Sequence, residues 1–277
     1  MRHSGRHLPD LADEILAGRR PGLAGRHAGR TDGRPTGRTG RGAGRVVSGG
    51  RRDEARAGAR TQAVRVKTAK GRKISSTLWL RRQLNDPYVI EAQRQGYRSR
   101  AAFKLIQLDD KLRFLKPGMK VADLGAAPGG WTQVAVKRVH AETPGRGRVV
   151  GIDLIPWEPV PGAVCLERDF MDPLAPGLLK DALDGTADAV LSDMAANTTG
   201  HAGADHLRIM ALVEAAYQFA QEVLTPGGVF VAKVFQGGAE HGLLAAMKLR
   251  FQSVRHIKPA ASRKESSELY LVATGFR

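Results

Sequence analysis

The chain has 277 residues, 42% of them hydrophobic and 26% charged, and its formal net charge is +17. This length suits one large domain with an extension, or two small domains. No apolar stretch approaches the roughly 20 residues that a membrane-spanning helix needs, so no association with a membrane is expected. The single cysteine, Cys165, excludes an internal disulfide, and the cysteine and histidine spacings match no metal site, so no metal is predicted.

Positive charge is concentrated at the start of the chain. Residues 1–73 contain 19 Arg or Lys, only 6 Asp or Glu, and no Phe, Trp or Tyr. Such a segment buries too little apolar surface to offset its ordering entropy, so we predict a disordered Gly/Arg-rich basic extension. It is expected either to add salt-dependent affinity for RNA phosphates or to be dispensable. Two acids interrupt its apolar run at residues 11–18, so no signal peptide is predicted and a cytoplasmic location is expected, although arginine-rich starts are also typical of transit peptides.

Residues 74–277 alternate between helical and strand patterns, which predicts an α/β domain. Helices are expected at 86–95, 99–114, 132–139, 176–183, 205–224 and 239–250, and strands at 120–124, 148–153, 163–166, 187–192, 229–235, 253–257 and 269–274. Ser99 is the expected N-cap of the second helix, and residues 225–228 (Thr-Pro-Gly-Gly) are a stop signal after the long one. Cys165 is expected to be a buried strand residue. The alternation indicates a mostly parallel sheet covered on both faces, with an antiparallel final pair because no helix separates the last two strands.

The most informative segment is residues 121–131, Val-Ala-Asp-Leu-Gly-Ala-Ala-Pro-Gly-Gly-Trp. A short strand, a glycine-rich turn and a helix in succession form the arrangement that holds a nucleotide-like ligand at the carboxyl ends of parallel strands. The turn lacks the G-x-G start of dinucleotide sites, and Pro128 has no backbone N–H to offer a pyrophosphate. We therefore expect a nucleoside without phosphates, with S-adenosylmethionine (AdoMet) as the candidate, and a dehydrogenase is disfavoured.

Charged residues at the strand ends are the next candidates. Asp153 lies where an acid can bind ribose hydroxyls, and Asp169 where one can meet an adenine amino group while Phe170 packs on the ring; solvated charges are the alternative. Lys233 stands in an otherwise apolar strand, where an unpaired charge is costly, so we expect it to be functional. Asp193 follows another strand, and its alternative is to cap the next turn together with residue 197. Taken alone, Lys104 and Glu268 would be read as solvent-facing charges and Trp131 as a core residue.

Several sequence blocks together resemble the FtsJ-like family of RNA ribose 2′-O-methyltransferases. They are residues 96–105 (Gly-Tyr-Arg-Ser-Arg-Ala-Ala-Phe-Lys-Leu), 123–131 (Asp-Leu-Gly-Ala-Ala-Pro-Gly-Gly-Trp), 192–197 (Ser-Asp-Met-Ala-Ala-Asn), 233–237 (Lys-Val-Phe-Gln-Gly) and 267–270 (Ser-Glu-Leu-Tyr). Each block is moderately specific, whereas five in this order and spacing are highly specific. The likeness runs from about Thr77 to the C-terminus. One departure is Ala196, where related bacterial enzymes usually carry proline, and it concerns loop stiffness rather than charge.

The resemblance implies a Rossmann-like, seven-stranded AdoMet-dependent methyltransferase fold, mostly parallel with an antiparallel last strand. The activity that it implies is methylation of the ribose 2′-hydroxyl of a uridine in large-subunit (23S) ribosomal RNA, during late ribosome assembly, by a monomer. Transfer RNA as substrate, or a non-catalytic RNA-binding assembly factor, remain alternatives. The implied catalytic tetrad is Lys104, Asp193, Lys233 and Glu268. The implied AdoMet contacts are Gly129, Trp131, Asp153, Asp169 and Asp193.

The implied tetrad makes chemical sense for a ribose hydroxyl, which is a poor nucleophile at neutral pH. Lys233, near a second ammonium group at Lys104 and partly removed from water, is the expected base, with Asp193 and Glu268 orienting the two lysines. Basic residues on both sides of the glycine loop are expected to flank the acceptor site and bind RNA phosphates, the alternative being a solvated face. These are Arg94, Arg98, Arg100, Lys111, Arg113, Lys116, Arg255, Lys258, Arg263 and Lys264.

Overall fold

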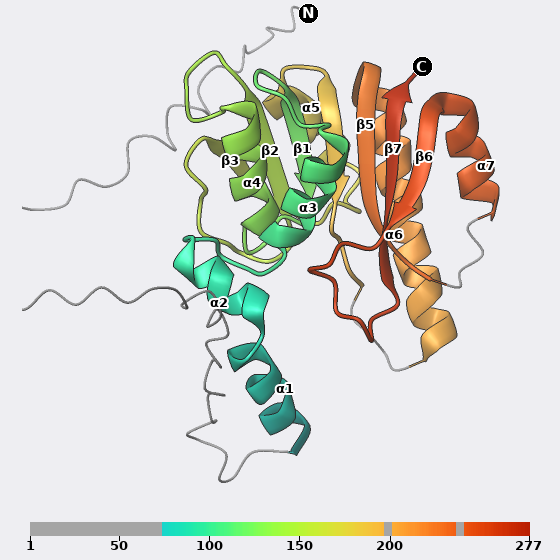
Figure 1. Cartoon of the computed structure of the whole chain (residues 1–277). Coiled ribbons are helices and arrows are strands. Elements are labelled where there is room, and N and C mark those ends of the chain that lie inside the picture. Colours follow the sequence, from blue (N-terminus) through green and yellow to red (C-terminus); the bar gives the residue numbers. More distant parts are fainter. Residues whose placement is uncertain (1–73, 197–200, 237–240) are drawn as a thin grey trace, which may run out of the picture. The chain divides into compact units, whose positions relative to one another are not determined.

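The computed structural model describes residues 74–196, 201–236 and 241–277 (Figure 1). The predicted disordered extension, residues 1–73, lies outside the described residues and stays a prediction. The same holds for the alternative in which residue 197 would share a turn with Asp193. Among the described helices, none combines the length and the apolar character that crossing a membrane requires.

Seven strands of the described residues form one sheet in the order β3-β2-β1-β4-β5-β7-β6. Strands β1 to β5 run parallel, whereas β7 is antiparallel to both of its neighbours, β5 and β6. This confirms the predicted fold class, a mostly parallel methyltransferase sheet with an antiparallel last strand. The strands are β1 (Lys120–Leu124), β2 (Arg148–Asp153), β3 (Ala163–Glu167), β4 (Ala187–Ser192), β5 (Leu224–Phe235), β6 (Phe251–Ile257) and β7 (Glu268–Phe276).

The helices follow the predicted order, with one addition at the start. They are α1 (Ile74–Leu84), α2 (Pro87–Arg94), α3 (Ala102–Leu112), α4 (Gly130–Val139), α5 (Ala175–Leu183), α6 (Ala202–Val223) and α7 (His241–Arg250). Helix α1 was not predicted, because its apolar residues Ile74 and Leu78 are exposed and form no stripe that faces a core. Helix α2 has both expected start signals: Asp86 accepts a hydrogen bond of 3.0 Å from the backbone N–H of Tyr88, and Pro87 opens the helix.

Two local predictions, those for Ser99 and Cys165, were wrong, and one strand begins earlier than expected. Ser99 does not cap α3, which begins after Ala101 without a side-chain cap; the Ser99 hydroxyl is instead buried with no hydrogen-bond partner among the described residues. The stop signal at residues 225–228 does end α6, but β5 begins at once and includes it, at a register shift opposite Ala187. Cys165 is only half-buried, because β3 is an edge strand, and this partial burial raises the pKa of its thiol.

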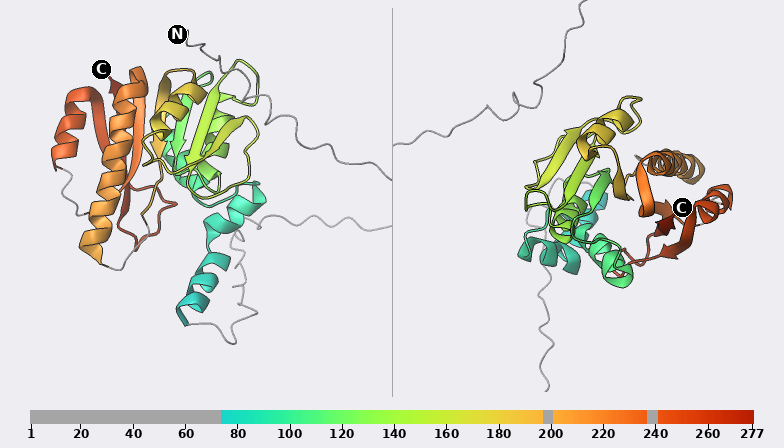
Figure 2. Two further views of the ribbon diagram at one scale, coloured as in Figure 1. Left: turned by 180° about the vertical axis from the view of Figure 1, so that it is seen from behind. Right: turned by 90° about the horizontal axis from the view of Figure 1, so that it is seen from above.

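The sheet separates two apolar cores, which determines where the functional side chains point. Helices α3 and α4 lie over one face, and α5, α6 and α7 lie over the other (Figures 1 and 2). Successive side chains of a strand alternate between the faces. In β5, Val229 and Val231 pack on the α3 side, whereas Phe230 packs on the α6 side. Residues of β5 separated from Val231 by an even number of positions therefore face α3.

Candidate active site

Strand alternation brings three of the predicted site residues to the face that α3 covers. Asp193 continues the alternation of Leu191, and Lys233 continues that of Val231. Glu268 precedes Tyr270, which packs in the same core. Because β4, β5 and β7 are neighbours, with Lys233 directly opposite Tyr270, these side chains meet at one end of the sheet.

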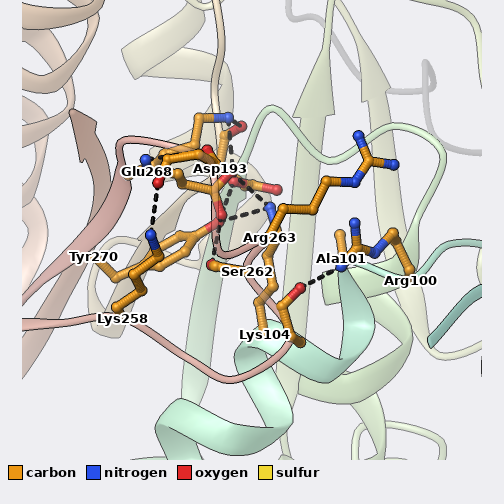
Figure 3. Close-up of polar contacts among 12 residues, drawn as sticks. Arg100, Ala101, Lys104, Asp193, Lys258, Ser262, Arg263, Glu268 and Tyr270 are labelled. Carbon is orange, nitrogen blue, oxygen red and sulfur yellow. Dashed lines mark hydrogen bonds and ion pairs between the residues drawn. The ribbon is translucent and has the colours of Figure 1, made fainter. Parts of the chain in front are cut away.

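The fourth residue, Lys104, reaches the same place from the first turn of α3 (Figure 3). Its Nζ lies 2.8 Å from Oε2 of Glu268, and the two side chains are only 13% and 15% exposed. The other carboxylate oxygen of Glu268 accepts a hydrogen bond of 2.7 Å from the hydroxyl of Ser262. Both oxygens of Glu268 are thus held, one by a cation and one by a buried hydroxyl.

Lys233 and Asp193 form a second ion pair beside the first. Nζ of Lys233 lies 3.2 Å from Oδ1 of Asp193 and also donates to the backbone carbonyl oxygen of the same residue. Lys233 is 7% exposed, so the predicted cost of a charge in an apolar strand is offset by this pairing. Burial raises the pKa of Asp193, but the ammonium groups of Lys233 and Lys104 and the hydroxyl of Tyr270 outweigh it and hold that pKa below its usual range.

Tyr270, to which no role was assigned from the sequence, joins the two ion pairs. Its hydroxyl donates a hydrogen bond of 2.8 Å to Oδ1 of Asp193 and accepts one of 3.1 Å from Nζ of Lys104. Burial, together with the charges of Asp193 and Glu268, raises the pKa of this hydroxyl well above its usual range, so it stays protonated and keeps donating. The only sequence signal for Tyr270 was its place in the block at residues 267–270.

A cavity of about 530 Å³ lies on one side of the four charged residues, at the carboxyl ends of the strands. Asp153, Asp169 and Asp193 line it together with Phe170 and Ala196. Asp153 accepts a hydrogen bond of 2.9 Å at each carboxylate oxygen, one from the N–H of Ala127 in the glycine loop. Asp169 accepts one of 2.9 Å from the N–H of Met171. Each acid keeps lone pairs that can accept further hydrogen bonds.

Gly129 and Trp131, the other two predicted cofactor contacts, do not line this cavity. The Trp131 ring is buried against Tyr270, with centroids 5.5 Å apart, and its N–H donates a hydrogen bond of 2.8 Å to the carbonyl oxygen of Ala101. Gly129 has φ of 108°, which only glycine adopts readily, and a Cβ there would crowd Val160 and Arg98. Both residues therefore position the glycine loop rather than line the cavity.

A second cavity, of about 260 Å³, lies on the other side of the charged residues. Lys104, Glu268 and Ser266 line it, together with Arg100 and Arg263. Two guanidinium groups in its wall give this cavity a positive rim (Figure 3). An anionic chain such as RNA is the ligand that such a rim attracts.

The carboxylate of Asp86, which does not itself line the second cavity, contacts both of these arginines. Its Oδ2 lies 3.0 Å from a guanidinium nitrogen of Arg100 and 3.9 Å from one of Arg263. Asp86 is itself buried and caps α2, so the start of that helix fixes where the two positive groups stand.

The basic residues expected to flank one acceptor site are divided between several places. Arg100 and Arg263 line the second cavity, beside Lys104 and Glu268. Arg98 instead donates to backbone carbonyl oxygens, among them that of Pro128 at 3.2 Å, and so fixes the glycine loop. Four other residues do not line the second cavity and lie at the far end of α3 and around it, so their predicted contact with RNA stays a prediction: Lys111, Arg113, Lys116 and Arg255.

No group of three or more His, Cys, Asp or Glu within residues 74–196, 201–236 and 241–277 is placed to hold a metal ion. The charges at the centre of the site are instead balanced among themselves, two ammonium groups against two carboxylates.

Comparison with known proteins identifies relatives of this chain. The FtsJ-like methyltransferase family model matches residues 97–276. The chain is 66% identical over 221 residues to the ribosomal RNA large subunit methyltransferase E of Paramagnetospirillum magneticum, covering 79% of this chain and 91% of that protein. It is 63% identical over 226 residues to the enzyme of the same name from Rhodospirillum rubrum, covering 82% and 86%.

A solved structure is similar as well. A Plasmodium falciparum protein described as a ribosomal RNA methyltransferase matches with a TM-score of 0.57 and 30% identity, covering 65% of this chain and 98% of that one. The family model spans more than half of the chain and includes the strands, the glycine loop and all four charged residues. The chain therefore belongs to the FtsJ-like methyltransferase family.

Proposed function

We propose that this protein transfers a methyl group from AdoMet to the ribose 2′-hydroxyl of a uridine in large-subunit (23S) ribosomal RNA, as a monomer in the cytoplasm that acts on the large subunit or its late precursor. The observation that carries the proposal is the position of the two ion pairs. Asp193 lines one cavity, Lys104 and Glu268 line the other, and Tyr270 links the pairs. Such a group of side chains suits a reaction between two ligands. The names of the related bacterial proteins support ribosomal RNA as the acceptor.

The first cavity suits the nucleoside part of AdoMet. Asp153 ends β2 beside the glycine loop, where its free lone pairs can accept hydrogen bonds from ribose hydroxyls. Asp169 can accept from an adenine amino group, and Phe170 offers an apolar surface for the ring. Among the described residues, no arginine or lysine except Arg208 lines this cavity, which agrees with a ligand that has no phosphates. AdoMet supplies an activated methyl group on a sulfonium when it is bound.

The second cavity suits the target nucleotide. Arg100 and Arg263 would bind the phosphates next to the target ribose. Lys233 then accepts the proton of the 2′-hydroxyl while the ribose oxygen takes the methyl group from the sulfonium sulfur. This requires Lys233 to enter the step as the neutral amine. Asp193 orients Lys233, and the ion pair with Glu268 orients Lys104. Holding the ribose oxygen, the methyl carbon and the sulfur of the donor in one line accelerates the reaction by itself.

The test is site-resolved mapping of 2′-O-methylation in ribosomal RNA. Cells without the protein should lack one methylated uridine in the large-subunit RNA. Wild-type protein should restore it, whereas Lys233→Ala should lower the rate roughly 100-fold or more, the usual size of a lost general base. Lys248→Ala, an exposed lysine of α7, is the matched control and should restore methylation fully.

The alternatives give different outcomes in the same experiment. A tRNA methyltransferase would modify naked tRNA and leave the ribosomal RNA pattern unchanged when it is deleted. An RNA-binding assembly factor would support subunit assembly equally well as wild type and as Lys233→Ala, with no methylated position lost. Either outcome would overturn the proposed reaction.

A further inference from the structure

A groove of about 410 Å³ lies outside the two cavities described above. One wall is the carboxyl end of α3 and the loop that follows it, with Lys111, Arg113 and Lys116. The floor is the sheet, where Val229 of β5 and Thr274 of β7 are directly paired. Arg255 of β6 adds a fourth cation, and no Asp or Glu of residues 74–196, 201–236 and 241–277 lines the groove.

The positive charge of this groove is not neutralised by the described parts of the protein. No ion pair among the described residues involves Lys111, Arg113, Lys116 or Arg255, and all four are exposed. The nearest acids on α3, Asp109 and Asp110, are both bound by Arg138, at 3.3 Å in the case of Asp109. Four cations around one groove repel one another, so an anionic ligand is favoured there.

The groove lies on the same face of the sheet as the active site. Tyr270 and Thr274 point to the same side of β7, and their separation of four residues corresponds to about 13 Å of strand. Along α3, Lys111 lies seven residues beyond Lys104, or about 10 Å. A stacked nucleic-acid strand rises about 3.4 Å per nucleotide, so roughly three or four nucleotides span this distance.

We infer that the groove of Lys111, Arg113, Lys116 and Arg255 binds the phosphodiester backbone of the RNA substrate three or four nucleotides away from the methylated ribose. This inference rests on the proposed function, because the RNA that enters the active site is the chain that reaches the groove. The contact is to phosphates and carries no base recognition, so it contributes affinity and register rather than chemistry. The basic front end of the chain itself, with its excess of Arg and Lys, is no candidate for this groove, since like charges repel.

The main test is a double variant, Lys111→Gln with Lys116→Gln. Arg113 is left unchanged, because its φ of 51° limits the residues that can replace it. The probe is the large ribosomal subunit from cells that lack the protein. The dissociation constant should rise about tenfold, and the slope of log affinity against log salt should fall by about 1.5, the value for two lost phosphate contacts. The KM for subunits should rise in parallel while kcat stays unchanged.

The matched control removes the same charge elsewhere. Lys180→Gln with Lys248→Gln, on α5 and α7, should leave affinity, salt slope and KM at their wild-type values. An unchanged dissociation constant in the groove variant, or an equal loss in the control, would overturn the inference. Failure of the proposed function is distinguishable, because it would appear as absent methyl transfer by the wild-type protein, whereas the binding measurement would still report on the groove.

A second measurement separates an RNA chain from a free phosphate ion. Amine-reactive labelling of Lys111 and Lys116 should be blocked by the subunit RNA but not by inorganic phosphate at the same phosphate concentration. Protection by inorganic phosphate alone would assign the groove to a small anion and overturn the inference.

Discussion

The hydroxyl of Tyr270 lies 2.8 Å from Oδ1 of Asp193 and, on its other side, 3.1 Å from Nζ of Lys104. One phenol therefore links the two ion pairs, Lys104–Glu268 and Asp193–Lys233. Removing the hydroxyl leaves the carboxylate of Asp193 with one donor fewer and Lys104 without a neutral neighbour.

Tyr270→Phe should lower kcat by about tenfold or somewhat more, since a hydrogen bond to a charged group contributes about 1.5–3 kcal/mol. The affinity for AdoMet, measured by calorimetry, should change little, because Tyr270 does not line the first cavity. Tyr217→Phe is the control: that hydroxyl is also buried but has no hydrogen-bond partner among the described residues, so its loss should not affect kcat. Equal rates for both variants would contradict the role assigned to Tyr270.

Asp153→Asn should weaken AdoMet binding. Both carboxylate oxygens accept backbone N–H groups at 2.9 Å, and the amide would direct an NH₂ at one of these donors. We expect a 10- to 100-fold higher dissociation constant for AdoMet, corresponding to about 1.4–2.8 kcal/mol. Affinity for the ribosomal subunit should stay the same, because Asp153 is remote from the second cavity. Weaker RNA binding with unchanged AdoMet binding would reverse the assignment of the two cavities.

Asp123 should make stability depend on pH. Its side chain is fully buried, accepts a hydrogen bond of 2.6 Å from the Thr132 hydroxyl, and has one oxygen without a partner among the described residues. Burial raises its pKa from 3.8 to about 7. The folded protein thus binds more protons than the unfolded chain between these two values, so the free energy of unfolding falls as pH rises through this window.

Asp123→Asn removes that dependence while the amide oxygen still accepts from Thr132. Urea unfolding at about pH 5 and about pH 8 should show the variant gaining stability relative to wild type at the higher pH, by about 2.5 kcal/mol, since about two pKa units lie between pH 5 and the pKa of about 7. Asp181→Asn, at an exposed acid of α5, should show no such pH-dependent gain. If the free energy of unfolding changed with pH in the same way for wild type and Asp123→Asn, the raised pKa of Asp123 would be contradicted.

Asp86→Ala should impair RNA binding without touching the four central charges. Asp86 holds Arg100 and Arg263 and caps α2, so its loss frees both guanidinium groups and removes a cap worth about 1 kcal/mol. The KM for ribosomal subunits should rise several-fold and the melting temperature should fall modestly. Asp86→Asn separates the two effects, because asparagine also caps helices well but forms no ion pair. A KM restored to the wild-type value in Asp86→Asn would assign the effect to the cap alone.

Local patterns accounted for most of the fold and for part of the site. Strand and helix positions follow from apolar periodicity and turn residues, which act over a few neighbours, so the sheet and the glycine loop were predictable. Helix α1 was missed because it has no apolar stripe, and Ser99 was misread as a cap because whether a hydroxyl finds a backbone N–H depends on packing with α4. Basic residues occur on both sides of the glycine loop in the sequence, and this gave no sign that Arg98 fixes a loop while Lys111 lies in a separate groove.

The sequence by itself determined the class of sheet, mostly parallel with an antiparallel final pair, and the glycine loop that is typical of nucleoside binding. Through its resemblance to a family it also indicated the four charged residues. Only the tertiary structure decided how these residues act together. Lys104 and Glu268 are 164 positions apart, and no local pattern can express that they lie 2.8 Å from each other. Alternation along β4, β5 and β7 turns Asp193, Lys233 and Glu268 to one face, and packing of α3 on that face adds Lys104. The role of Tyr270 exists only because those charges converge around its hydroxyl.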